Sequence, residues 1–245
     1  MRYNDIVLTV RSLKKSFGPV DALVEGDLTL ERGKITALVG NNGAGKTTLI
    51  KCITGALRPD YGYISIRGKA TPSLTLAEAR RRGVATVYQD LALVDVLDVA
   101  SNIWLGMEPS RWGIVDREAM RHRSIELLKR FAIDLPSVAT PVSDLSGGQR
   151  QAVALARAIA QEGDILILDE PTSAMGIVER SHIVDTVKKL REDGQAILYI
   201  SHDMEQVLET ADEVVIMRNG RTVACIPADE LDPLSLAGRI SGAIS

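Results

Sequence analysis

The sequence has few cysteines, few aromatic residues and no long apolar run. Its two cysteines, Cys52 and Cys225, lie far apart, with no CxxC pair and no histidine at metal-ligand spacing. This excludes a disulfide framework and a zinc site and fits reduced thiols in a cytosolic compartment. No uncharged apolar stretch approaches the roughly 18 residues of a membrane-spanning helix, and the first ten residues lack the apolar core of a signal peptide. We therefore expect a chain that meets a membrane only through partners.

An excess of basic charge is also absent. The chain of 245 residues has 29 Lys and Arg against 32 Asp and Glu, a formal charge of -3, and is 45% hydrophobic. That composition is typical of an ordinary globular protein that can bury a sizeable core. The short basic clusters Arg80–Arg82 and Arg121–Arg123 fit solvated helix faces. We expect no nucleic-acid partner.

Short strands alternate with helices along the chain. Apolar runs and alternations predict strands at 6–11, 27–30, 34–39, 63–66, 165–168 and 196–200, and helical spacing predicts helices at 46–57, 74–82, 117–131, 147–161 and 178–192. This order predicts an α/β fold with a mostly parallel sheet flanked by helices. We divide the chain into a β-rich part (1–89), an inserted α-helical subdomain (90–144), a core (145–228) and a tail without functional signal (229–245).

A glycine-rich stretch lies between the strand predicted at 34–39 and the helix predicted at 46–57. It reads Gly40-Asn41-Asn42-Gly43-Ala44-Gly45-Lys46-Thr47, with Thr48 next, and matches the phosphate-loop pattern. In such a loop the backbone N–H groups wrap phosphate oxygens, the lysine neutralises charge and the Thr47 hydroxyl reaches Mg²⁺. The stretch therefore predicts a P-loop NTPase-type fold.

Two acids end the apolar strand at 165–168. Asp169 and Glu170 would lie at the carboxyl edge of the sheet, where α/β proteins bind ligands. We expect Asp169 to hold hydrated Mg²⁺ and Glu170 to act as the general base that activates a water. A strand that ends in Asp-Glu is weak evidence alone, and the upstream phosphate loop gives it weight.

The run Leu145-Ser146-Gly147-Gly148-Gln149 is the most specific signal. Ser146 can cap a helix that begins at Gly147, and an open helix N-terminus is an anion site. A phosphate loop together with this run resembles the nucleotide-binding domain of the ABC ATPase family. The resemblance extends from about Ile6 to about Cys225, with the main motifs in the expected order.

The resemblance implies roles for further residues. ATP and Mg²⁺ would be the cofactors, and an N-terminal antiparallel β subdomain would precede the parallel core. In the family two domains pack head to tail, so Ser146, Gly147, Gly148 and Gln149 would bind the nucleotide held by a second domain. Gln89 matches the glutamine switch near the metal, His202 matches the histidine switch, and Phe17 falls where an aromatic residue stacks on adenine. The catalytic group would comprise Glu170, His202, Gln89 and Lys46.

One segment departs from the family pattern. Ser173-Ala174-Met175-Gly176 has glycine where many members carry an aspartate that contacts the opposing subunit. Coupling across the dimer at Gly176 is therefore an open question. Both the glycine at this position and the sequence Asn102–Gly106 resemble the ATPases of monosaccharide importers.

We therefore expect the ATP-hydrolysing subunit of an ABC importer at the cytoplasmic face of the inner membrane. It would energise uptake of a small solute, a monosaccharide, through a permease fed by an extracytoplasmic binding protein. Since the chain has one such domain, a homodimer is the simplest arrangement. The alternatives are a soluble ABC ATPase of iron–sulfur cluster assembly, an ABC protein of translation or DNA maintenance, and a module that binds ATP without turnover.

Overall fold

The computed structural model describes residues 5–172 and 175–244. The chain divides into two compact units. The first comprises the residues up to Thr86, Gly163–Asp169 and the residues from Arg191 onward, and the second comprises Val87–Glu162 and Glu170–Leu190.

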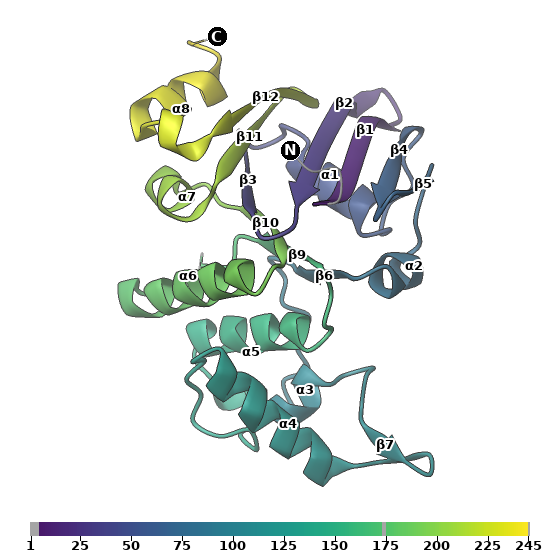
Figure 1. The fold of residues 1–245 in the computed structure, drawn as a ribbon, viewed down its shortest axis with the longest axis vertical. Helices are drawn as coiled ribbons and strands as arrows, with labels where there is room; N and C mark the ends of the chain where they lie inside the picture. Colours follow the sequence, from purple (N-terminus) through teal and green to yellow (C-terminus); the bar gives the residue numbers. More distant parts are fainter. Residues whose placement is uncertain (1–4, 173–174, 245) are drawn as a thin grey trace. The chain divides into compact units, whose positions relative to one another are not determined.

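A ten-stranded sheet runs through the first unit, counted over the described residues, in the order β5-β4-β1-β2-β12-β11-β3-β10-β9-β6 (Figure 1). Its strands are β1 (Ile6–Phe17), β2 (Val20–Glu31), β3 (Ile35–Val39), β4 (Tyr61–Ile66), β5 (Lys69–Thr71), β6 (Val84–Val87), β9 (Ile165–Asp169), β10 (Ala196–Ile200), β11 (Glu213–Arg218) and β12 (Arg221–Pro227). β1 pairs antiparallel with β2 and β4, and β4 with β5. β3 pairs parallel with β10 and β11, and β10 with β9. An antiparallel N-terminal part therefore joins a mostly parallel core, and this confirms both the parallel sheet predicted from the order of elements and the antiparallel part that the family resemblance implies.

The difference between the two parts follows from the residues. All of β3 and β10 is buried, because both faces of a parallel sheet are covered. β1 and β2 alternate between buried and accessible positions, as expected when one face meets solvent.

Four helices described in the first unit are α1 (Lys46–Ile53), α2 (Leu76–Arg81), α7 (Met204–Thr210) and α8 (Pro233–Ser241). Val207 of α7 and the α8 residues Leu236 and Ile240 pack in one buried cluster with Val39 and Ile216. α7 and α8 therefore cover the strands β3 and β11.

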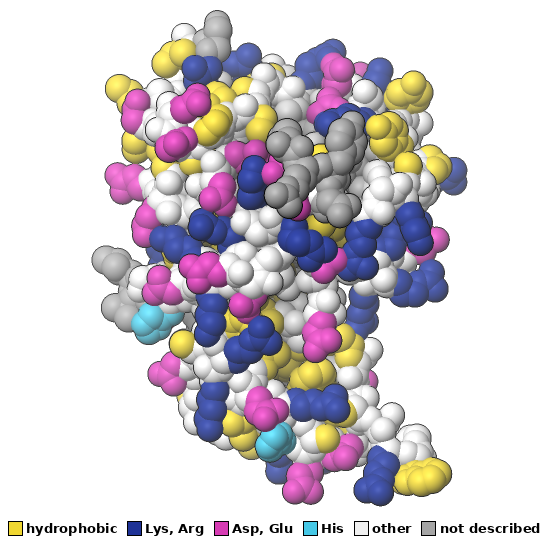
Figure 2. All heavy atoms as spheres, viewed as in Figure 1, with side chains coloured by type: hydrophobic (Ala, Val, Ile, Leu, Met, Phe, Trp, Pro, Cys, Tyr) yellow, Lys and Arg dark blue, Asp and Glu magenta, His cyan; other side chains and the backbone are white. Residues whose placement is uncertain are grey.

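The second unit is mostly helical. It contains α3 (Val99–Ile103), α4 (Arg117–Arg130), α5 (Gly147–Ile159) and most of α6 (Ile177–Glu192), with a short hairpin of β7 (Ser110–Arg111) and β8 (Ile114–Val115). Its core joins Val99 and Ile103 of α3, Leu128 of α4 and Val153 and Ala156 of α5. Hydrophobic side chains stand out at the hairpin in Figure 2, where Trp112 is 92% exposed.

Several predicted boundaries were wrong for local reasons. The helix predicted at 46–57 ends at Ile53, because Gly55 has a φ of +77° that no helix continues through. The helix predicted at 74–82 spans 76–81, because the Thr75 side chain caps its first turn. The strands predicted at 6–11 and 27–30 extend to 6–17 and 20–31, and together they form one long hairpin.

Cys52 and Cys225 are both free thiols. Burial raises the pKa of Cys52 to about 11. Cys225 is exposed as a residue, but partial desolvation of its thiol and the neighbouring Glu213 carboxylate raise its pKa to about 11 as well, so neither is a ready thiolate at neutral pH. Among the residues that the structure describes, no helix has both the length and the apolar composition to cross a membrane.

Candidate functional site

The loop from Gly40 to Gly45 connects β3 to α1, as predicted. Gly40, Gly43 and Gly45 have φ values of +154°, +80° and +102°. A Cβ on Gly45 would lie 2.7 Å from the carbonyl oxygen of Ala22, and one on Gly40 would collide with the carbonyl oxygen of Met217. Only glycine fits at positions 40 and 45, because both the dihedral angle and the space exclude a side chain.

The ammonium of Lys46 is held inside this loop. Its Nζ donates to the carbonyl oxygens of Gly40, at 2.6 Å, and Asn41, at 3.2 Å. Thr47 is exposed and Thr48 half-buried in the first turn of α1. A positive charge and hydroxyls at a helix N-terminus form an environment for phosphate oxygens.

The turn between β11 and β12, which is distant in the sequence, forms a hydrogen bond with the phosphate loop. The amide of Gly220 donates to the carbonyl oxygen of Ala44 at 3.0 Å, and the Gly220 carbonyl accepts from the amides of Val24 and Glu25. Gly220 belongs to the turn between β11 and β12. Our sequence reasoning missed this hairpin, although Asn219-Gly220 between two apolar runs is a strong hairpin signal.

A cavity of about 310 Å³ opens beside the loop. It is lined by Val20, Asp21, Ala22 and the continuous stretch Asn42–Thr48. Phe17, predicted to stack on adenine, pairs with Val20 across the β1–β2 hairpin, and its side chain is 48% exposed. The first unit therefore offers a phosphate cradle after β3, a cavity shared between that loop and the β1–β2 turn, and an accessible aromatic ring at the same turn.

Three parallel neighbours, β3, β10 and β9, end at the same edge of the sheet. Gly40 follows β3, Asp169 ends β9 and His202 follows β10 after the buried Ser201. His202 is exposed and Asp169 half-buried. The structure thus places the phosphate loop, Asp169 and His202 at one ligand-binding edge.

The oxygen donors at this edge suit a magnesium ion. Thr47 offers a hydroxyl at the start of α1 and Asp169 a carboxylate at the end of β9. Mg²⁺ prefers oxygen ligands and is bound through one or two protein groups together with substrate phosphates. The donors in the first unit fit that chemistry.

Glu170 belongs to the second unit and has an unusual backbone. Its φ is +52°, the left-handed region that a glutamate rarely adopts. Its carbonyl oxygen accepts a hydrogen bond of 3.2 Å from Nε2 of Gln151, a 5% exposed residue of α5. Gln151 was not among our predicted site residues, since only the packing reveals its contact with Glu170.

The Ser146–Gln149 run forms a helix start, as predicted. Ser146 Oγ accepts from the amide of Gln149, and Gln149 Oε1 accepts from the amide of Ser146. Ser146 and Gly147 are exposed. Gly148 is buried, and a Cβ there would touch Cγ of Glu179 at 3.4 Å. The N-terminus of α5 is therefore capped locally and open on its outer side.

The departure at Gly176 has a structural counterpart. A Cβ on Gly176 would lie 2.6 Å from the Glu179 carboxylate, so that carboxylate occupies the space of a larger side chain. Gly176 itself is exposed, and Ser173 and Ala174 lie outside the described residues.

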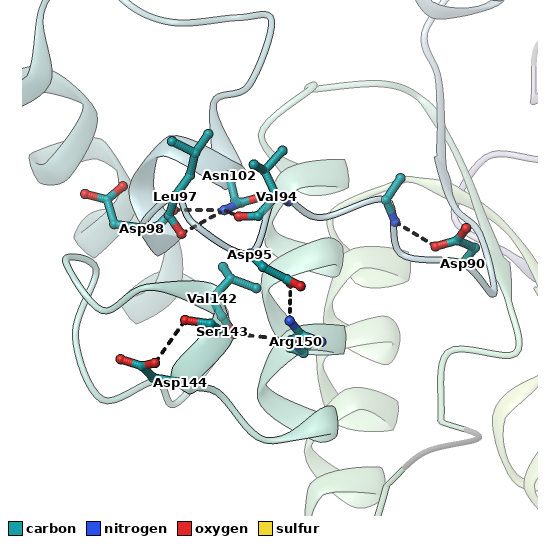
Figure 3. Close-up of polar contacts among 11 residues, drawn as sticks. Asp90, Val94, Asp95, Leu97, Asp98, Asn102, Val142, Ser143, Asp144 and Arg150 are labelled. Atoms are coloured by element: carbon teal, nitrogen blue, oxygen red, sulfur yellow. Dashed lines mark hydrogen bonds and ion pairs between the residues drawn. The ribbon is translucent and has the colours of Figure 1, made fainter.

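Gln89 is exposed just after β6. The loop that follows it, residues 90–98, is held by hydrogen bonds and an ion pair (Figure 3). The fully buried Asn102 accepts from the Val94 amide at 2.8 Å and donates to three carbonyl oxygens of the same loop. Asp95 forms an ion pair with Arg150, the residue after Gln149. This network attaches the loop after Gln89 to the helix that carries Ser146–Gln149.

The geometry described above is that of a nucleotide-binding protein of the phosphate-loop class. A family model described as ABC transporter matches residues 23–173, and the chain belongs to this family.

Named relatives are similar over most of the chain. A ribose import ATP-binding protein of Rubrobacter xylanophilus is 42% identical over 91% of this chain and 44% of its own length. A putative ribose/galactose/methyl galactoside import ATP-binding protein of Ralstonia nicotianae is 40% identical over 93% of this chain and 44% of its own length. The galactofuranose transporter ATP-binding protein of Escherichia coli is 37% identical over 96% of this chain and 47% of its own length. The chain therefore spans about half the length of the curated relatives it matches.

Solved structures show the same fold. A nucleotide-free ATP-binding cassette from an ABC transporter has a TM-score of 0.86 at 24% identity, over 98% of this chain and 99% of that one. A dimeric ATP-binding cassette in a post-hydrolysis state, bound to ADP and Pi, has a TM-score of 0.79 at 25% identity. The match covers 90% of this chain and 98% of that one.

Proposed function

We propose that this chain binds and hydrolyses ATP to drive uptake of a monosaccharide through a membrane permease. The observation that carries the proposal is the edge at which the phosphate loop, Asp169 and His202 meet. The class of solute is supported by the relatives, whose names describe sugars, and the direction of transport by the two whose names describe import of ribose or of ribose, galactose and methyl galactoside.

The residues of the first unit would bind the nucleotide. The amides of Gly40–Gly45 surround the phosphates, and Lys46 exchanges its loop carbonyls for phosphate oxygens. Thr47 and Asp169 of this unit would hold Mg²⁺, which neutralises charge on the phosphates when bound, and Gln89, a residue of the second unit, is proposed as a further ligand. Phe17 would stack on the base.

Hydrolysis would rest on positioning and charge. Glu170 orients a water and accepts its proton, and His202 and Gln89 contact the γ-phosphate region. Because the φ of Glu170 is strained, the hydrogen bond from Gln151 helps to keep this residue in place.

A second ABC domain would complete the site. The exposed Ser146 and Gly147 at the start of α5, with Gly148 and Gln149, would bind the nucleotide held by that domain. A second copy of this chain or a domain joined to it would serve, and the dimeric state of a cassette with the same fold, bound to ADP and Pi, supports this proposal.

The assembly would lie at the cytoplasmic face of the inner membrane, with an extracytoplasmic binding protein that delivers the sugar. The alternative, a soluble ATPase of iron–sulfur cluster assembly, has no support in the three relatives named above, whose names describe sugar import or transport. The permease and the binding protein would select the solute among these sugars.

Two variants test the chemistry. Glu170→Gln should lower steady-state ATP hydrolysis by at least about 100-fold, the usual contribution of a general base, while ATP still binds and traps a dimer. Lys46→Ala should weaken ATP binding itself, because the cation at the phosphates is lost. Unchanged turnover in Glu170→Gln would remove Glu170 from the base role, and unchanged affinity in Lys46→Ala would contradict the phosphate-loop assignment.

Isolation from native membranes tests the assembly. The chain, tagged and extracted in mild detergent, should bring along a polytopic permease and a sugar-binding protein that mass spectrometry identifies. Recovery of soluble cluster-assembly proteins or ribosomes instead would overturn the importer proposal.

A further inference from the structure

Lys15 lies next to the ring that is proposed to stack on adenine. It precedes Phe17 by two residues in β1, so both side chains leave the same face of the strand. The Lys15 Nζ lies over the Phe17 ring, 5.6 Å from its centroid. That distance is within the range in which an ammonium is attracted to the face of an aromatic ring.

The position of Lys15 is fixed from a second side. Its Nζ donates to Asp60 Oδ1 at 2.8 Å, and the Lys15 side chain is only 17% exposed. The other oxygen of Asp60 accepts from the Ser16 amide at 2.8 Å, and Ser16 Oγ donates to Asp21 at 2.6 Å. The ammonium is therefore held in place rather than moving freely in solvent, and Asp21 lines the cavity beside the phosphate loop.

The Phe17 ring remains open despite this contact. Its side chain is 48% exposed, and it ends the strand directly opposite Val20, which lines the same cavity. A base that extends from phosphates in the loop would therefore meet a ring whose orientation is already set. Fixing a contact group before binding lowers the entropic cost of binding.

We propose that Lys15 is a positioning residue for the nucleotide base. It holds the Phe17 ring through its ammonium, and the cation withdraws electron density from the ring, which favours stacking with an electron-rich purine on the accessible face. Asp60 keeps the ammonium at the ring. This inference rests on the proposed function, because it deepens the role of Phe17 in ATP binding.

The test separates the base from the phosphates. ATP and inorganic tripolyphosphate, which has no base, are titrated against the full chain by calorimetry. Lys15→Met should weaken ATP binding by about two- to five-fold, the size of one exposed cation–π contact, and leave tripolyphosphate binding unchanged. Lys15→Arg, which keeps the cation, should restore the affinity for ATP.

The chain offers a matched control in the next residue. Lys14 lies over the Tyr61 ring, also 5.6 Å from its centroid, and that pair does not involve Phe17. Lys14→Met removes the same charge and the same kind of contact from the same strand. It should leave ATP affinity within error of the unmodified chain.

A double substitution shows whether Lys15 acts through the ring. Phe17→Ala alone should weaken ATP binding by roughly five-fold or more, because stacking on one base contributes about 1–3 kcal/mol. In that background Lys15→Met should have no further effect on ATP binding.

Equal weakening of ATP and tripolyphosphate by Lys15→Met would overturn the inference and assign Lys15 to the phosphates. Equal effects of Lys14→Met and Lys15→Met would overturn it in favour of general electrostatics. Failure of the unmodified chain to bind ATP at all would instead contradict the proposed function, so the two failures are distinguishable.

Discussion

Gln151 Nε2 donates a hydrogen bond of 3.2 Å to the carbonyl oxygen of Glu170. The donor belongs to the helix that begins with the Ser146–Gln149 run, and the acceptor belongs to the residue proposed as general base. This contact connects the two most informative motifs of the second unit through a single buried amide.

Gln151→Met should therefore lower ATP turnover more than it lowers ATP affinity. The change keeps the volume of the side chain and removes the donor, so the strained backbone at Glu170 loses one restraint. A small displacement of a catalytic group can cost a large factor in rate, and we expect a loss of about ten-fold in kcat. Steady-state kinetics and equilibrium ATP binding measure the two effects.

Gln195 provides the control for this change. Its Nε2 donates to the carbonyl oxygen of Gly163 at 2.8 Å, in the first unit. Gln195→Met should reduce stability to a similar extent and leave kcat unchanged. Equal losses of kcat in both variants would show that Gln151 acts through stability alone.

Gly45→Ala should abolish the geometry of the phosphate loop. The methyl group would meet the Ala22 carbonyl oxygen at 2.7 Å, and the φ of +102° is unfavourable for alanine. We expect ATP affinity to fall by about ten-fold or more, since a clash with backbone must move the loop. Gly68→Ala, at a φ of +75° with open space around it, introduces backbone strain without touching the loop. Calorimetric titration of both variants with ATP compares them, and an equal loss in both would contradict the steric explanation.

Asp164 makes stability depend on acid pH. Burial alone would raise the pKa of its carboxyl group, but Arg32 and Arg67 outweigh burial and lower the pKa below the ordinary value of 3.8. Because the folded-state pKa is depressed, this stabilisation is complete above the unfolded value and disappears as the pH falls through the folded value. Asp164→Asn should lower the free energy of unfolding by about 1 kcal/mol at pH 7, as for a partly exposed ion pair. Urea unfolding from pH 7 to pH 3 should show the two proteins converging below pH 3.8, and a constant difference would refute the assignment.

Asn102 should be among the most costly residues to replace in the second unit. Asn102→Leu would leave the Val94 amide without its acceptor and would remove the side-chain donor from three loop carbonyls, which keep their backbone donors, at an expected cost of about 2 kcal/mol. Hydrogen exchange at Val94 should accelerate with it. Asp90→Ala removes an exposed contact to the Ala92 amide in the same loop and should change stability by less than about 0.5 kcal/mol. Comparable losses in both variants would contradict a special role for the buried amide.

The core of the fold was predictable because its signals are local. The apolar runs of β3, β9 and β10, the glycine loop at Gly40–Gly45 and the cap at Ser146 each follow from adjacent residues, and the structure confirms them. Helix and strand ends were less predictable, since Gly55 stops α1 only through its own backbone angle.

The supports of the site were not predictable in this way. Gln151 with Glu170 and Gly220 with Ala44 join residues that are distant in the sequence, and their partners emerge only from packing. Lys15 gives no signal beyond its charge until the structure places it over the Phe17 ring. The roles predicted for Gln89, Glu170, His202 and the Ser146–Gln149 run stay predictions.

The strand β3, which precedes the phosphate loop, pairs with strands that come much later in the sequence. β3 lies between β10 and β11, and the turn at Gly220 that holds the Ala44 carbonyl is formed by residues about 175 positions further along the chain. Such distant pairings are slow to form, and synthesis proceeds from the N-terminus. A nascent chain released before Gly220 would therefore carry the complete glycine-rich sequence without the wall that shapes it. The capacity to hold a phosphate would therefore arise only after Gly220 has been synthesised, long after the glycine-rich sequence itself.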